Sequence, residues 1–411
     1  MFDRLKNFLG TVTASHASVI GVDVGSAYLK IVQFRRKGGK AVLETYGALA
    51  LGPYAGLEIG RATRLPPDKL AEALRDVLRE AHATSTRSAF AIPFSSSLVA
   101  TMQMRVLDMK QLPTMVSLEA RKYVPVPISE VNLDWWIIPE EPAVRENSGG
   151  LGAPKQPVQP DGLGAGEASA PALPGEGEAA SARQNAPIRS EADDSNAPKN
   201  MKILIAAIHN EALGRYQQVV RESGLQSSFF EIELFSTIRA LLPQDLEAHA
   251  VLDLGAGETK LYVIDRGLVR LSHIMSHGGQ DITLALSQGL GISVEEAEKK
   301  KRRDGIQAAE GAGQAPVSAL LNVIFSETNR ALLGFERRFG RKMQDVILSG
   351  GGANLPGIAR LAGESVSVPV RRADPFKQAE APAFLEEVLQ GVGPEFSVAA
   401  GIAFRGLQEE A

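Results

Sequence analysis

Two short segments, one in each half of the chain, place an aspartate at the end of an apolar run and a glycine two residues later. They are Asp-Val-Gly at residues 23–25 and Asp-Leu-Gly at residues 253–255, and their aspartates stand 230 residues apart (253 minus 23). A strand that ends in this way and turns back presents a carboxylate and a row of backbone N–H groups at one point, which suits a phosphate and its Mg²⁺. A single copy is most often ordinary hairpin chemistry, but two copies can hold one phosphate chain between them.

A lysine follows each of these aspartates seven residues later, in the strand that returns from the turn. These lysines are Lys30 and Lys260. The shared aspartate, glycine and lysine make the match between the two halves longer than a lone dipeptide. The repeat predicts two duplicated lobes that open with the same hairpin.

A third segment brings three consecutive glycines to the end of an apolar strand. It reads Asp-Val-Ile-Leu-Ser-Gly-Gly-Gly-Ala-Asn-Leu-Pro-Gly at residues 345–357. Where side chains are absent, a flat ligand can approach the backbone closely. A nucleotide base or ribose fits this description.

The segments around these motifs alternate between strand-like and helix-like patterns, which indicates an α/β fold. In the first half, apolar runs at 19–25 and 28–34 precede a helix that begins near Pro67 and a further strand at 88–93. The second half has strands at 250–257, 259–265 and 345–352, and helices near 281–288, 294–303 and 317–338.

The composition of the 411-residue chain excludes several classes of protein. Hydrophobic residues make up 44% and charged residues 22%, as in a globular protein of two or more domains. The net charge of −4 offers no excess of basic residues for a nucleic-acid backbone, and the absence of cysteine excludes disulfides and thiolate metal sites. No run approaches the roughly 20 apolar residues that cross a bilayer. We therefore expect neither a nucleic-acid partner nor an integral membrane protein.

Residues Glu141–Asn200 are rich in alanine, glycine, proline, serine and glutamate and contain no aromatic residue. Such a segment cannot bury enough apolar surface to offset the entropy of ordering, which predicts a disordered insertion. Strand-like and helix-like patterns resume at 201–225. The insertion is therefore expected to lie within a domain.

The order of the two acidic turns and the glycine segment resembles the phosphate-1, phosphate-2 and adenosine motifs of the superfamily of actin, sugar kinases and heat-shock chaperones. The resemblance implies an actin-like two-lobed ATPase fold with duplicated ribonuclease H-like lobes, which binds ATP and Mg²⁺. It implies that Asp23 and Asp253 hold the Mg²⁺, through water. It assigns phosphate binding to Gly25, Ser26, Lys30, Gly255, Gly257 and Thr259, and adenosine binding to Glu298, Lys301, Gly350, Gly351, Gly352 and Asn354.

The charged run around two of these residues, at 295–303, also fits a solvent-exposed helix face. We keep the binding interpretation for Glu298 and Lys301 and the solvent-exposed one for their neighbours.

Residues 118–134 narrow the resemblance, because LEARKYVPVPISEVNLD is similar to the helix, Pro-x-Pro turn and acidic strand of PilM-type type IV pilus assembly proteins. Similar agreement at 278–283 and 397–405 extends it over nearly the whole chain outside the insertion. The resemblance implies a 1C subdomain of the FtsA and PilM kind. It also implies that Tyr123, Pro125 and nearby residues bind the N-terminal cytoplasmic segment of a PilN-like inner-membrane protein, although Tyr123 fits a core aromatic residue equally well.

Together these features predict a cytoplasmic protein that reaches the inner membrane only through PilN-like and other pilus inner-membrane partners. The expected domains are a first lobe (1A) of residues 1–97 and 201–248 completed by 394–411, a 1C-like subdomain of 98–140, the disordered insertion of 141–200, and a second lobe (2A/2B) of 249–393.

The activity of such a protein stays open at the level of sequence. Ala256 stands where actin has an aspartate, and Lys260 where heat-shock relatives often carry a second acid, so any ATP hydrolysis is expected to be weak or regulatory. No catalytic residue is assigned, because a general base is defined by geometry. The alternatives are a small-molecule kinase of the same superfamily, the cytoplasmic part of a type II secretion protein, and an FtsA-like cell-division protein. The last would need a basic amphipathic end, which residues 403–411 lack.

Overall fold

The computed structural model describes residues 18–106, 108–138, 199–309 and 314–409. The expected disordered insertion lies outside these residues, apart from its last two, which begin a strand. The described chain divides into two compact units. One comprises Met1–Ala100, Ala120–Asp134 and Ile205–Ala411, and the other comprises Thr101–Glu119 and Trp135–Leu204.

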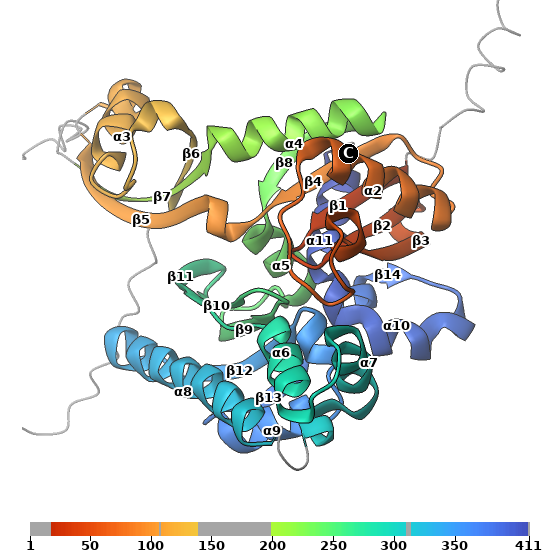
Figure 1. The fold of residues 1–411 in the computed structure, drawn as a ribbon. Coiled ribbons are helices and arrows are strands. Elements are labelled where there is room, and N and C mark those ends of the chain that lie inside the picture. Colours follow the sequence, from red (N-terminus) through yellow and green to blue (C-terminus); the bar gives the residue numbers. More distant parts are fainter. Residues whose placement is uncertain (1–17, 107, 139–198, 310–313, 410–411) are drawn as a thin grey trace, which may run out of the picture. The chain divides into compact units, whose positions relative to one another are not determined.

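A six-stranded sheet carries the first acidic turn. Its strands lie in the order β14-β3-β2-β1-β4-β8 (Figure 1). The neighbours β1, β2 and β3 are antiparallel because short turns join them, whereas β4 pairs in parallel with both β1 and β8. The bounds are β1 Ser18–Val24, β2 Tyr28–Lys37, β3 Lys40–Ala50, β4 Arg87–Ile92, β8 Gln226–Ile232 and β14 Ala379–Glu380.

Helices cover both faces of this sheet, because alternate residues of β1 and β2 point to opposite sides. One face packs against α2 (Pro67–Glu80) and α4 (Asn210–Ser223). The other packs against α11 (Ser397–Gln408), which also contacts α5 (Glu233–Leu241). The helix predicted to begin near Pro67 is present as α2, and its buried residues are Leu70, Ala71, Ala73, Leu74 and Val77.

Helix α11 crosses β1 at Gly21 in very close contact. A Cβ atom at this position would overlap the carbonyl oxygen of Ala399 and would lie 2.9 Å from the Cβ of Ala403. The small residues of this crossing therefore allow the helix to lie directly on the strand.

We expect Gly21→Ala to lower the free energy of unfolding by about 1–3 kcal/mol, because the helix must move away from the strand. Urea unfolding followed by circular dichroism measures this change. Gly334→Ala in α8 (Gln314–Phe339) is the matched control, since a Cβ there meets nothing within 4 Å. It should leave stability unchanged or raise it by up to about 1 kcal/mol. Equal unfolding midpoints for Gly21→Ala and the unmodified chain would contradict the close approach.

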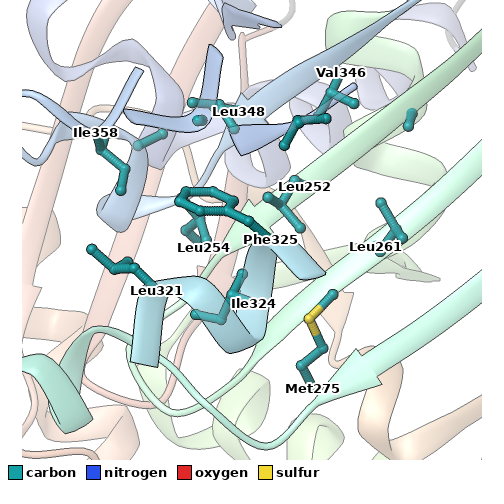
Figure 2. Packing of buried hydrophobic residues seen from close by; sticks show 14 of the residues in the cluster. Leu252, Leu254, Leu261, Met275, Leu321, Ile324, Phe325, Val346, Leu348 and Ile358 are labelled. Carbon is teal, nitrogen blue, oxygen red and sulfur yellow. The ribbon is translucent and has the colours of Figure 1, made fainter. Parts of the chain in front are cut away.

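A five-stranded sheet carries the second acidic turn, with strands in the order β11-β10-β9-β12-β13. Every residue of β9 is buried, because helices α6 to α9 cover one face and the apolar side of α5 covers the other. Figure 2 shows Phe325 of α8 among side chains of β9 and β12. The bounds are β9 Ala248–Leu254, β10 Thr259–Asp265, β11 Leu268–Met275, β12 Met343–Ser349, β13 Val370–Arg372, α6 Gly279–Leu290, α7 Val294–Asp304 and α9 Ile358–Ser365.

The two predicted hairpins are present, and they match residue for residue. In the first, Asp23 of β1 is the cross-strand partner of Lys30 in β2. In the second, Asp253 of β9 is the cross-strand partner of Lys260 in β10. Directly opposite residues of an antiparallel pair project from the same face, so each lysine lies beside its aspartate.

A third sheet has three strands in the order β5-β7-β6. Its middle strand, β7, begins at residue 199 and shares a sheet with strands from the expected 1C-like segment, whereas the expected map placed residues from 201 onward in the first lobe. An apolar strand pattern does not reveal which sheet the strand joins. The bounds are β5 Ser97–Val106, β6 Val131–Ile138, β7 Lys199–His209 and α3 Leu112–Ala120.

The segment before α11 also differs from the expected map, which gave residues 249–393 to the second lobe. Strand β14 pairs with β3, and Phe376 and Leu389 pack with Phe34 and Phe404 in the core of the first sheet. The first lobe therefore takes its covering from residues well before 394, including α10 (Glu386–Val392). Among the helices of the described ranges, none is long and apolar enough to cross a membrane.

Candidate functional site

A cavity of about 590 Å³ opens where both acidic turns and the glycine segment end. The parallel pairs β1–β4, β4–β8 and β9–β12 place the carboxyl ends of their strands at this point, where ligands of α/β proteins commonly bind. The predicted site residues that line the cavity are Asp23, Gly25, Ser26, Lys30, Asp253, Gly255, Gly257, Glu298, Lys301, Gly350, Gly351, Gly352 and Asn354.

The first turn presents a buried ion pair. The Nζ atom of Lys30 lies 3.1 Å from Oδ2 of Asp23, and both side chains are largely buried. Burial alone would lower the pKa of the Lys30 ammonium, but the Asp23 carboxylate outweighs it and raises this pKa above its usual value. Lys30 is therefore a charged donor at the cavity wall.

The second turn presents a denser cluster of charge. The Nζ atom of Lys260 lies 2.7 Å from Oε1 of Glu233, 3.4 Å from Oε1 of Glu258 and 3.9 Å from Oδ2 of Asp253. Burial raises the pKa values of the Glu233 and Asp253 carboxyls, and Lys260 opposes this rise.

Glu233 was not predicted from the sequence. It is the first residue of α5, directly after the parallel strand β8, and its Oε1 accepts a hydrogen bond of 2.6 Å from the backbone N–H of Phe94. The usable signal was its position, because a polar residue after a buried parallel strand lies at the edge where ligands bind. Nothing in the sequence told which of the several glutamates near residue 231 faces the cavity.

Glycines shape both turns. A Cβ at Gly25 would lie 2.9 Å from the carbonyl oxygen of Tyr28, and one at Gly255 would lie 2.6 Å from that of Glu258. The two turns also touch, since the backbone N–H of Gly257 donates a 3.1 Å hydrogen bond to Oγ of Ser26. The two turns thus meet at one end of the cavity.

Thr259 is the one predicted phosphate-binding residue that does not line the cavity. Its Oγ1 donates a 2.7 Å hydrogen bond to the carbonyl of His277, and its side chain is fully buried. The reason is the alternation of a strand: Lys260 faces the cavity beside Asp253, so its neighbour Thr259 must point to the opposite face.

The glycine segment lines the cavity beside the second turn. Gly350 has a positive φ of 79°, and a Cβ there would overlap Oδ1 of Asp253. A Cβ at Gly352 would lie 2.7 Å from that of Leu254, whereas one at Gly351 would meet nothing within 4 Å. Asn354 lies beside them and accepts a 2.9 Å hydrogen bond from Arg372. The segment therefore provides an open, side-chain-free surface over Gly351.

Glu298 and Lys301 form a buried pair on α7, with 2.6 Å between Oε2 and Nζ. Thr283 of α6 joins them, since it donates to Glu298 and accepts from Lys301, each at 2.7 Å. Burial lowers the pKa of the Lys301 ammonium. Burial alone would raise the pKa of the Glu298 carboxyl, but the charges of Lys301 and Arg302 outweigh this effect and hold the Glu298 pKa below its usual value. Both side chains are charged and fixed in orientation.

Arg302 lines the cavity as well, although the sequence favoured a solvent-exposed role for the neighbours of Glu298 and Lys301. Its guanidinium lies over the ring of Tyr28, 4.8 Å from the ring centre. Gln280 of α6 also contacts the first half of the chain, because its Oε1 accepts a 2.6 Å hydrogen bond from the N–H of Ala62. These contacts join helices of the second sheet to the hairpin and loop of the first.

The two predicted partner-binding residues lie away from the cavity, in the segment between α3 and β6. Tyr123 is 39% exposed and Pro125 is also exposed. Tyr123 is therefore not a core residue. The buried residue of this segment is Val124, which packs with Val131 and Ala207.

The charges at the end of the cavity where the two turns meet fit a divalent cation. Four carboxylates gather there against two ammonium groups, which leaves an excess of two negative charges. Mg²⁺ prefers oxygen ligands and keeps several of its waters. In the part of the chain that the structure describes, no group of three or more histidine, cysteine or acidic side chains is placed to hold a metal ion. The donor set therefore suits a cation held through water rather than a closed metal centre.

Two lobes that open with matched Asp-to-Lys hairpins and share one cavity define the actin-like class of α/β proteins. The chain belongs to the family of the type IV pilus assembly protein PilM, whose model matches residues 21–151 and 191–407. The family resemblance and the actin-like fold expected from the sequence are thereby confirmed.

Three relatives illustrate the range of this similarity. The solved structure of a PilM-PilN type IV pilus biogenesis complex aligns with 95% of this chain and 99% of its own, at a TM-score of 0.71 and 21% identity. MreB 5 of Spiroplasma citri bound to AMPPNP aligns with 96% of this chain and 97% of its own, at a TM-score of 0.45 and 12% identity. The cell division protein FtsA of Neisseria meningitidis serogroup B is 23% identical over 213 residues, which are 46% of this chain and 51% of FtsA. The chain thus spans about half the length of this curated relative.

Proposed function

We propose that this chain is a nucleotide-binding scaffold of type IV pilus assembly that binds ATP with Mg²⁺ and the N-terminal cytoplasmic segment of a PilN-like inner-membrane protein. It acts at the cytoplasmic face of the inner membrane, which it reaches through this and other pilus partners. The observation that carries the proposal is the pair of matched turns, in which Asp23 with Lys30 and Asp253 with Lys260 line one cavity.

The phosphate chain binds at the end where the turns meet. Gly25, Ser26, Gly255 and Gly257 let its oxygens approach the backbone of the two turns, and Lys30 supplies a positive charge. Asp23 and Asp253 hold Mg²⁺ through its waters, and the ion would offset the repulsion between these carboxylates and the phosphates.

The adenosine binds along the glycine segment. The open backbone of residues 350–352 receives the flat base, and Asn354 borders it. Glu298 is a fixed acceptor for the ribose hydroxyls, and Lys301 holds it in place while also donating to Thr283 and to the carbonyl of Gly279.

The same geometry disfavours rapid ATP hydrolysis. Glu233 is the buried carboxylate that a water-activating role would call for, but it lies 2.7 Å from Lys260 and also accepts a hydrogen bond from Phe94. Burial raises the pKa of this carboxyl, but a carboxylate held by a lysine and a backbone N–H has little freedom to orient a water. Nucleotide binding and release would therefore act as the signal, with any turnover slow.

The partner segment binds at the surface that contains Tyr123 and Pro125, on the proposed 1C-like subdomain. The support is the exposure of both residues, the family membership of the chain, and the PilM-PilN complex among its structural relatives. The nucleotide-bound and nucleotide-free proteins can differ in conformation. The nucleotide then changes the affinity for the partner segment by as much as these two conformations differ in binding it.

A titration of the full chain with a fluorescent N-terminal peptide of the partner, with and without Mg-ATP, tests this function. We expect binding whose affinity changes with nucleotide, and we expect Tyr123→Ala to weaken it by about tenfold or more. Phe384→Ala is the control, because Phe384 is an even more exposed aromatic residue, at 81%. ATP binding without peptide binding would instead favour the kinase or the cell-division alternative. Equal losses in the two variants would contradict the role of Tyr123.

A further inference from the structure

Lys260 stands at a point where three acidic side chains converge. Its side chain is largely buried, and its Nζ atom lies within 4 Å of Glu233, Glu258 and Asp253. Lys30, its counterpart in the first hairpin, forms its ion pair with Asp23 among the described residues, and the Glu395 carboxylate also acts on it. The two lysines therefore differ in function: Lys30 can turn toward a phosphate, whereas Lys260 is held by its neighbours.

The closest partner of Lys260 is Glu233, and Asp253 is the most distant of the three. Lys260 thus neutralises chiefly the glutamates, while the second carboxylate oxygen of Asp253 faces Gly350. Burial alone would lower the pKa of the Lys260 ammonium, but Glu233 and Asp253 raise this pKa well above its usual value, so the side chain carries its charge at all physiological pH values.

We propose that Lys260 is a built-in cation at the phosphate end of the cavity, which lets a nucleoside polyphosphate bind with only a weak dependence on free divalent cation. The inference rests on the proposed function, because it assumes that the cavity binds nucleotide. An ammonium group and a divalent ion would neutralise the same carboxylates, and two positive charges a few ångströms apart repel each other. The lysine therefore replaces part of the charge that a metal ion would bring and keeps the nucleotide-free cavity from binding one.

Removal of the Lys260 charge should make nucleotide binding depend strongly on a divalent cation. It should also let the nucleotide-free cavity bind such a cation. In Lys260→Met, the side chain keeps its length, but Glu233, Glu258 and Asp253 lose their shared counter-ion. Three carboxylates around one point attract a hard divalent cation and repel a phosphate chain. Nucleotide binding should then require the metal.

The experiment uses the full chain and two readouts. Calorimetric titration with ATP, in EDTA and in Mg²⁺, should give affinities that differ by about tenfold or less for the unmodified chain and by about a hundredfold or more for Lys260→Met. Without nucleotide, Mn²⁺ electron paramagnetic resonance should show free ion with the unmodified chain and bound ion with Lys260→Met. Lys260→Arg should restore the original behaviour. Lys299→Met, which removes an exposed lysine of α7, should not change it.

The outcomes separate this inference from the proposed function. Tight ATP binding in Mg²⁺ with none in EDTA for the unmodified chain overturns the inference and leaves the proposed function standing. ATP binding in neither buffer overturns both. A folded Lys260→Met that keeps the original affinity ratio and binds no Mn²⁺ also overturns the inference. If this variant does not fold, the affinity ratio of the unmodified chain decides.

Discussion

Replacing the two turn aspartates should remove the part of ATP affinity that depends on Mg²⁺. We expect Asp23→Asn and Asp253→Asn each to weaken ATP binding in Mg²⁺ by about threefold, because each loses a carboxylate that holds the waters of the ion. In EDTA neither variant should bind ATP more weakly, since the lost charge repelled the phosphates. The double variant should bind ATP equally in both buffers. Calorimetric titrations in the two buffers measure these affinities.

Weaker ATP binding in Mg²⁺ without weaker binding in EDTA separates a cation-binding role from a general loss of structure. Asn preserves the shape of Asp, so the hairpin pairing of Asp23 with Lys30 and of Asp253 with Lys260 is retained. Thermal unfolding should therefore show folded variants. Asp68→Asn, at an exposed position in the first turn of α2, is the matched control and should leave ATP affinity unchanged. Unchanged affinity in both Asp23→Asn and Asp253→Asn would show that the turns are not the cation site.

The second large effect is expected at Gly350. Alanine there must adopt a φ of 79° and would overlap Oδ1 of Asp253. We expect Gly350→Ala to lower the free energy of unfolding by about 1–3 kcal/mol and to abolish ATP binding, because the strain moves Asp253 and closes the end of the cavity. Chemical denaturation and an ATP titration of the same sample measure the two effects.

Gly351→Ala is the control for this change. A Cβ at Gly351 meets nothing within 4 Å, and the residue has no positive φ. The variant should fold with unchanged stability and bind ATP more weakly, since the methyl group fills the surface on which the base lies. If Gly350→Ala matched Gly351→Ala in stability, the close contact with Asp253 would not exist in solution.

The parts of the site that could be predicted are those in which one short segment contains all that the chemistry needs. The turns at Asp23 and Asp253 were of this kind, because an aspartate, a glycine and a returning lysine follow one another along the chain. The glycine segment could be predicted as well, since three consecutive glycines can be recognised directly in the sequence. Their common cavity followed from the repeat, which implied two similar lobes.

The misassigned residues depend on the direction of a side chain or on pairing between distant segments. Thr259 was included with the second turn, but its neighbour Lys260 lies beside Asp253 in the structure, and the alternation of a strand turns Thr259 away. Glu233 was missed because its approach to Lys260 depends on where β8 lies relative to β10. Arg302 was left on the solvent side of α7 because Tyr28, over which it lies, belongs to the other half of the chain.

Two strands pair differently from what the expected domain map suggests, for a related reason. Strand β7 has a strand-like apolar pattern that fits either neighbouring sheet, and the structure places it between β5 and β6. Strand β14 is two residues long, which is too short for any pattern to reveal. Its pairing with β3 and the burial of Phe376 nevertheless bring the segment before α11 into the core of the first lobe.

The central claim is that one nucleotide is bound by both turns and by the glycine segment at once. Hydrogen–deuterium exchange of the full chain, compared with and without Mg-ATP, tests it most directly. We predict that ATP slows exchange together at residues 23–30, 253–260 and 350–354, at concentrations that follow its affinity. Slowed exchange in only one of these segments, or in none, would contradict the shared site.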